Sequence, residues 1–136
     1  MTKILLPFIS ILFISYFAKG QQGTTIVIKP DSVYENVDVP ASFKGGDAAW
    51  NKFLQRKLVY PSGAISGGIE GSVLVGFNVE IDGSVKDVKA LSGPAELRDA
   101  AISVVKKSPY WIPAQKYGRN VKSYNNKLIN FTLHVP

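Results

Sequence analysis

The stretch SVLVGFNVEIDGSVKDVKALS, residues 72–92, decides the fold. Every second residue of its first half is apolar, namely Val73, Val75, Phe77, Val79 and Ile81. This period of two predicts a β-strand with one buried face. Asp82-Gly83 then predicts a type I′ hairpin turn, which needs positive φ at both central residues. On the return strand Val85 and Val88 are out of phase, so we expect a β-bulge near Lys86-Asp87.

A helix is expected on each side of this hairpin. Asp47–Leu58 has one apolar stripe, made of Trp50, Phe53, Leu54 and Leu58. Gly93-Pro94 opens the second helix, with proline at its first position, and Ser108-Pro109 ends it. The stripe of this second helix is Leu97, Ala100, Ala101, Val104 and Val105. Between the first helix and the hairpin, Ser62–Gly68 reads as a flexible connector.

Lys122–Val135 is expected to form the last strand, because Ile129, Phe131 and Leu133 alternate with polar residues. The order helix, strand, strand, helix, strand predicts an α+β fold of the αββαβ type. Its three-stranded antiparallel sheet has both helices on one face and two open edges. Upstream, Thr24–Lys29 has the composition of a short strand, and Val33–Pro40 suits an extended lead-in.

Residues 1–20 have the pattern of a secretory signal peptide. Lys3 precedes an apolar stretch, Ile4–Phe17, which is shorter than a bilayer span requires. Ala18 and Gly20 are the small residues expected before a cleavage site. The alternative is an uncut anchor in the inner membrane. A lipoprotein signal is excluded, because the chain has no cysteine to carry the lipid.

The bulk composition indicates one packed domain. Hydrophobic residues make up 46% of the 136-residue chain and charged residues 19%. We therefore divide the chain into the signal peptide, an N-terminal extension over 21–40 and a domain over 41–136. The net charge is +6, of which Lys3 and Lys19 carry two. No run of like charge exceeds Lys106-Lys107, so a nucleic-acid partner is not expected.

Catalytic machinery is not expected either. The single histidine, His134, lies on the polar side of the last strand, where a solvated residue is the ordinary reading. Glu70 and Glu80 could be the paired carboxylates of a glycoside hydrolase, but each lies among turn or strand residues where an ordinary surface glutamate is expected. The glycines of 62–71 lack the Lys-Ser/Thr of a phosphate loop. The sequence has no cluster of metal-ligand residues, so we predict no enzyme, metal or cofactor.

Five segments in succession resemble the C-terminal domain of the TonB energy-transducer family, in a form common among Bacteroidetes-type bacteria. They are VPASFKGGDAAWNKFL (39–54), VYP (59–61), GIEGSVLVGFNVEIDGSVKDVKAL (68–91), LRDAAISVVKKSPYWIPAQKYGRNV (97–121) and INFTL (129–133). The resemblance implies the predicted fold and a set of structural anchors: Trp50, Phe53, Phe77, Asp82, Gly83, Trp111, Pro113, Gly118 and Phe131. Tyr110, beside the Trp111 anchor, is expected to be half exposed.

In function, the resemblance implies protein binding in the periplasm. TonB-like domains grasp a short extended segment of outer-membrane transporters, the TonB box, which adds beside the last strand by β-augmentation. The residues expected to take part are Tyr60, Pro61, Lys127, Leu128, Asn130, Thr132 and His134. The alternative is that the edge is merely solvated, or is covered by Thr24–Lys29.

The chain also departs from the family pattern. Neither the membrane helix nor the long proline-rich spacer of a full transducer is evident, and Val59 and Ser62-Gly63 flank Tyr60-Pro61 where relatives place polar or basic side chains. We therefore expect an exported, stand-alone domain that binds a transporter or another envelope protein. A strand-swapped homodimer is compatible with the open sheet. The second functional hypothesis is a cell-envelope scaffold that associates with peptidoglycan.

Overall fold

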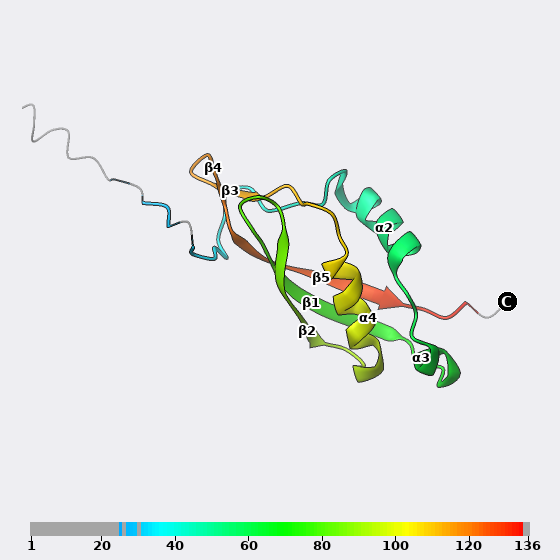
Figure 1. The fold of residues 1–136 in the computed structure, drawn as a ribbon. Coiled ribbons are helices and arrows are strands. Elements are labelled where there is room, and N and C mark those ends of the chain that lie inside the picture. Colours follow the sequence, from blue (N-terminus) through cyan, green and yellow to red (C-terminus); the bar gives the residue numbers. More distant parts are fainter. Residues whose placement is uncertain (1–24, 26, 30, 135–136) are drawn as a thin grey trace, which may run out of the picture.

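The computed structural model describes residues 25, 27–29 and 31–134 (Figure 1). The signal-peptide prediction for residues 1–20 therefore lies outside the described residues. The elements run in the order α2 (Gly46–Lys57), α3 (Ser62–Ser66), β1 (Gly71–Val79), β2 (Val85–Ser92), α4 (Ala95–Lys106), β3 (Ala114–Lys116), β4 (Arg119–Val121) and β5 (Ser123–Phe131). The predicted α+β fold is confirmed, with one short helix and one short hairpin added to it. None of the helices in the described part of the chain is long and apolar enough to cross a membrane.

The main sheet is antiparallel with strand order β2-β1-β5, so β1 is central and β5 lies at an edge. β1 and β5 pair along their whole length, from Gly71 opposite Phe131 to Val79 opposite Ser123. One side of β1 is completely buried, and it consists of Val73, Val75, Phe77 and Val79. The alternation seen in the sequence is therefore the alternation between core and open face.

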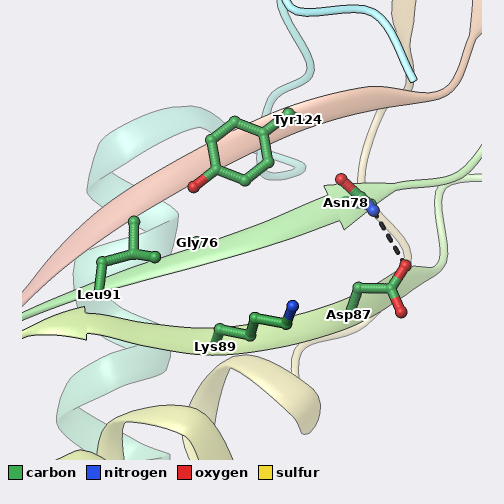
Figure 2. Close-up of a pocket in the computed structure, with 6 residues that line it drawn as sticks. All are labelled: Gly76, Asn78, Asp87, Lys89, Leu91 and Tyr124. Carbon is green, nitrogen blue, oxygen red and sulfur yellow. Dashed lines mark hydrogen bonds between the residues drawn. The ribbon is translucent and has the colours of Figure 1, made fainter.

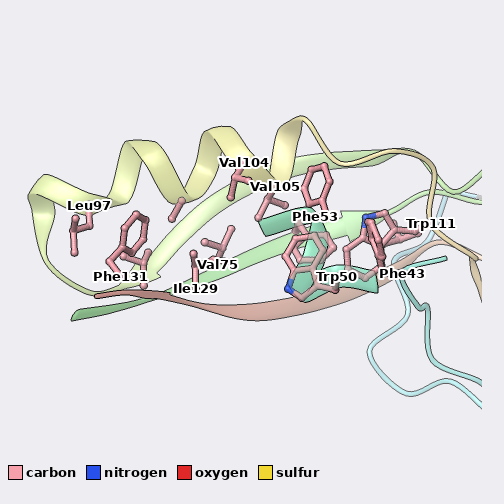
Figure 3. Packing of buried hydrophobic residues seen from close by; sticks show 14 of the residues in the cluster. Phe43, Trp50, Phe53, Val75, Leu97, Val104, Val105, Trp111, Ile129 and Phe131 are labelled. Carbon is pink, nitrogen blue, oxygen red and sulfur yellow. The ribbon is translucent and has the colours of Figure 1, made fainter. Parts of the chain in front are cut away.

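Side chains of α2 and α4 fill the space over this buried face (Figure 3). Leu97, Val104 and Val105 of α4 lie in the same cluster as Trp50 and Phe53 of α2. An aromatic group closes one end of the core, with ring centroids 5.2 Å apart for Phe43–Trp50 and for Phe77–Trp111. Trp111 is 4% exposed, whereas its neighbour Tyr110 is 67% exposed.

The turn between β1 and β2 is not the predicted type I′ turn. Gly83 has φ of +89°, but Asp82 is not among the residues with positive φ. The Gly83 N–H donates to the Glu80 carbonyl at 2.9 Å, and the Glu80 N–H donates to the Ser84 carbonyl at 2.8 Å. This is a three-residue loop with a glycine in the left-handed region after the turn. The type I′ geometry occurs instead at Tyr117-Gly118, between β3 and β4, where both φ angles are positive.

The predicted bulge on β2 is confirmed. Gly76 pairs with Lys89 and Asn78 with Lys86, so β2 has one residue more than β1 between these pairs. Asp87 lies in this bulge with φ of +54°. A second register shift, between Leu74 and Val75 of β1, was not expected from the sequence.

Four boundaries differ from the predictions. Ser62–Gly68 is not simply a connector, because it contains the short helix α3, which begins directly after Pro61. Pro94 precedes the first helical residue of α4 instead of being that residue. β5 ends at Phe131, short of the predicted Val135. Residues 25 and 27–29 form no strand; the rest of the 24–29 segment lies outside the described part.

Residues 31–42 form three isolated bridges, one to β5, one to β3 and one to the segment before β3. Tyr34 forms a parallel bridge with Ser123, and Val39 and Ser42 form antiparallel bridges with Gln115 and Ile112. The predicted extended lead-in is thus an integral part of the fold.

Candidate functional site

The outer edge of β5 is the candidate binding site, and its geometry follows from the pairing with β1. In an antiparallel pair, the N–H and C=O of alternate residues point toward and away from the neighbouring strand. The Tyr124 N–H points away from β1, because it donates to the Tyr34 carbonyl at 3.2 Å. By the same alternation, Asn126, Leu128 and Asn130 also direct their main-chain groups away from β1.

These three residues have no main-chain partner on that side among the described residues. All three side chains are exposed, and Leu128 is 54% exposed. Main-chain N–H and C=O groups in this arrangement form a template for a further strand. The free part of the edge is therefore Asn126–Asn130.

Tyr34 occupies the position just before this free part. Its N–H donates to the Lys122 carbonyl at 2.9 Å, beside the bond from Tyr124. Because the bridge is parallel, residues 31–33 run back toward the residues before Ser123, away from Asn126. The chain then bends at Glu35 and Asn36 and continues to the Val39 bridge with Gln115. Among the described residues, the segment 31–42 therefore covers only the first residues of the edge.

A groove runs between this edge and α2. It is lined by Asn51, Leu54 and Gln55 of α2, by Leu58 just after the helix, and by Leu128 and Asn130 of the strand, and it has a volume of about 340 Å³. The two strand residues are the ones whose outward main-chain groups are free. A strand added to β5 would therefore lie along this groove.

The comparison with protein families decides the identity of the domain. The model of the Gram-negative bacterial TonB protein C-terminal family matches residues 56–133. The chain belongs to the TonB C-terminal family. A search of curated proteins found no match.

The TonB match runs from the last residues of α2, through the whole sheet, to just beyond β5. The TonB C-terminal family is a non-enzymatic protein-interaction domain of the cell envelope, with a role in envelope transport. Its members interact with proteins such as outer-membrane transporters. Tyr34 and the first turns of α2 lie outside the matched range.

Among the residues predicted to bind, Leu128 lies at the centre of the free edge and Asn130 at its end. The main-chain groups of Lys127 face β1, because it alternates with Leu128, and its Nζ lies 3.3 Å from Asp47 Oδ1 on α2. Thr132 and His134 are exposed but follow the end of β5. The structure therefore brings only part of the predicted set together on the edge.

Tyr60 and Pro61 are not part of the free edge and make structural contacts. The Tyr60 hydroxyl donates to the Ile69 carbonyl, and its ring centroid is 5.5 Å from that of Phe131. Partial burial, and after it the charge of Glu70, raises the pKa of Tyr60. Pro61 precedes α3 and lines a hollow against α4.

Sequence reasoning missed Asn126 and the four groove residues on the helix side. Asn126 could have been found from the alternation that picked out Leu128 and Asn130. The groove residues gave no such signal, because Leu54 and Leu58 read as part of the buried helix stripe and Asn51 and Gln55 as a solvated face.

The open face of the sheet has a smaller hollow, of about 120 Å³, which Figure 2 shows. Asn78 Nδ2 donates to Asp87 Oδ2 at 3.0 Å, and the Tyr124 hydroxyl lies over Gly76. A Cβ at Gly76 would lie 2.3 Å from that hydroxyl oxygen, so the glycine makes room for the tyrosine. The hollow thus has a structural explanation.

Glu70 and Glu80, the carboxylates considered as a pair in the sequence, lie apart and have separate partners. Glu70 accepts the Leu133 N–H, and Glu80 Oε1 is 3.2 Å from Lys122 Nζ. These two glutamates flank β1 at opposite ends, about 30 Å apart at the rise of a strand. Paired carboxylates of glycosidases are within about 10 Å of each other. The described residues contain no group of three or more potential metal ligands.

Proposed function

We propose that this domain binds an extended segment of an outer-membrane transporter, or of another envelope protein, by strand addition along Asn126–Asn130. The single observation that supports this is the row of outward main-chain groups on β5 without a partner among the described residues. The setting is TonB-dependent transport, in which the segment bound is the TonB box of the transporter.

The free edge sets the length of the bound segment. From Asn126 to Asn130 is about 13 Å at the rise of a strand, so about five residues of the partner form the ladder. Three residues on β5 offer up to six main-chain groups, each worth about 0.5–1.5 kcal/mol net when paired. Such a contact gives modest affinity, which agrees with a transient interaction. The parallel bridge at Tyr34 limits extension of the ladder past Tyr124.

The location that we propose is the periplasm, after export with residues 1–20 as a signal peptide. An uncleaved segment would instead tether the domain to the inner membrane on its periplasmic side. N-terminal sequencing of the protein from cells distinguishes the two: Gln21 as first residue supports export and cleavage, and Met1 supports the tether. A strand-exchanged homodimer would use the same edge and would compete with the transporter segment.

Proline substitution tests strand addition directly, because proline removes the N–H donor. At Asn130 the lost N–H points outward, so the ladder to β1 is retained. We expect Asn130→Pro to weaken binding of synthetic TonB-box peptides at least tenfold in a fluorescence-anisotropy titration. Asn130→Ala is the matched control, since it removes the same side chain and keeps the N–H. Circular dichroism and urea unfolding check that both variants fold.

If Asn130→Pro folds and binds the peptides as tightly as Asn130→Ala, pairing along this edge is wrong. Leu128→Pro gives a second, independent measurement at the centre of the edge, with Leu128→Ala as its control.

A further inference from the structure

The groove between α2 and β5 has the geometry of a side-chain subsite. We infer that it receives an uncharged, apolar side chain of the added strand, at the position that pairs with Ile129; this inference rests on the proposed strand addition. The groove would then select among segments that the main-chain edge alone cannot tell apart.

The position follows from the pleat of the sheet. Side chains of paired residues on neighbouring strands point to the same face. Ile129 is completely buried on the face that α2 covers, whereas the Asn130 side chain accepts a hydrogen bond from the Ser72 hydroxyl on the open face. The partner residue opposite Ile129 therefore points toward α2, between the levels of Leu128 and Asn130, where the groove lies.

The lining decides the chemistry of the occupant. Leu54 and Leu58 supply aliphatic surface and Asn51 and Gln55 supply neutral amides, while Leu128 and Asn130 form the strand side of the groove. No charged residue lines the groove, so a charged occupant would lose hydration without gaining an ion pair.

Lys127, the cationic residue of this part of β5, is already paired. Lys127 Nζ lies 3.3 Å from Asp47 Oδ1 and 6.0 Å from the centroid of the Trp111 ring. An acidic side chain in the groove would have to displace this contact to pair with Lys127. The groove is thus matched in charge to a neutral aliphatic residue such as leucine, isoleucine or valine.

Host peptides of one design test the inference. The probes are Lys-Thr-Thr-Thr-X-Thr-Thr-Thr-Lys, capped at both ends, with X as leucine, alanine or aspartate; threonine favours the extended conformation. Binding is followed by NMR titration of the full chain, which measures dissociation constants into the millimolar range and reports the amides of Leu128 and Asn130. From the apolar surface buried, we expect the leucine peptide to bind about tenfold more tightly than the alanine peptide. The aspartate peptide should bind more weakly still.

A charge change in the groove gives a readout that misfolding cannot mimic. Gln55 is exposed on α2, and Gln55→Lys should strengthen binding of the aspartate peptide by about threefold, as an exposed ion pair does. The same change should weaken binding of the leucine peptide. Gln115→Lys is the matched control, because it makes the same substitution at an exposed residue of β3, away from the groove.

The outcomes separate the two proposals. If all three peptides bind equally and Asn130→Pro abolishes their binding, the subsite is wrong and strand addition stands. If none of them shifts the amides of Leu128 and Asn130, both are wrong. A free protein that is dimeric, with the amides of Asn126–Asn130 protected from exchange, would show that a second copy occupies the groove and would overturn the inference.

Discussion

Replacing Gly83 by alanine should be far more destabilising than the same change at Gly118, although both glycines have positive φ. Gly83 has φ of +89° and Gly118 has φ of +72°. A Cβ at Gly118 would have no neighbour within 4 Å, so only backbone strain counts, at about 1 kcal/mol. A Cβ at Gly83 would lie 2.1 Å from the Trp111 carbonyl oxygen, where ordinary contacts begin at 3.4 Å.

Relieving that overlap requires a shift of more than 1 Å between the turn and the Trp111 backbone. The shift disturbs the hydrogen bond from the Trp111 N–H to the Gly83 carbonyl, now 2.8 Å, and the packing of the indole. Loss of a buried hydrogen bond that leaves its donor unpaired costs about 1–3 kcal/mol. With backbone strain included, we expect Gly83→Ala to lower the free energy of unfolding by about 2–4 kcal/mol, against about 1 kcal/mol for Gly118→Ala.

Urea unfolding followed by tryptophan fluorescence measures both changes under the same conditions. Because both glycines have positive φ, the backbone strain of an alanine is similar at the two positions, and the difference between the two variants reports the contact with Trp111. Equal losses for the two variants, within about 0.5 kcal/mol of each other, would refute the role assigned to the close approach of the turn to Trp111.

Two further measurements test contacts near the site and in the turn. Tyr60→Phe removes the donor to the Ile69 carbonyl but keeps the ring on Phe131, so the free energy of unfolding should fall by about 1 kcal/mol; unchanged urea unfolding would contradict that bond. The Ser84 hydroxyl and N–H, which donate to the Asp82 carboxylate, lower the pKa of Asp82. A lowered folded-state pKa stabilises the fold above the unfolded pKa of about 3.9, and this stabilisation is lost as the pH falls through the folded value. The melting temperature of Asp82→Asn should therefore fall less than that of the wild type between pH 5 and pH 2, as measured by thermal unfolding at each pH. Equal falls in melting temperature for the two proteins would contradict this role of Asp82.

The fold could be predicted from the sequence where one periodic pattern is strong. The alternation of Val73 to Val79 fixed β1 and its buried face, and the apolar stripes placed α2 and α4. The out-of-phase valines of β2 located a bulge, because a strand with one buried face must bend where the phase changes. These signals are local, so the sequence carries them directly.

What could not be predicted depends on contacts between distant residues. The conformation of the loop at Gly83 is set by its contact with Trp111, and Asp82-Gly83 by itself favours a different turn. The bridge between Tyr34 and Ser123 joins residues that no local pattern relates. For the site, alternation gave Leu128 and Asn130, but the groove depends on how α2 lies beside β5. Helix periodicity predicts only which face of α2 is apolar.

The two margins of the sheet are not equivalent. β2 carries two register shifts, a residue with positive φ at Asp87, and exposed lysines at 86 and 89, all of which discourage another chain from pairing there. Polymerisation needs two competent margins on every subunit, so that each new molecule offers a fresh one. A molecule with a single edge strand able to pair can bind only one partner through its sheet. Any association through β5 would therefore end at a pair instead of growing into a fibre.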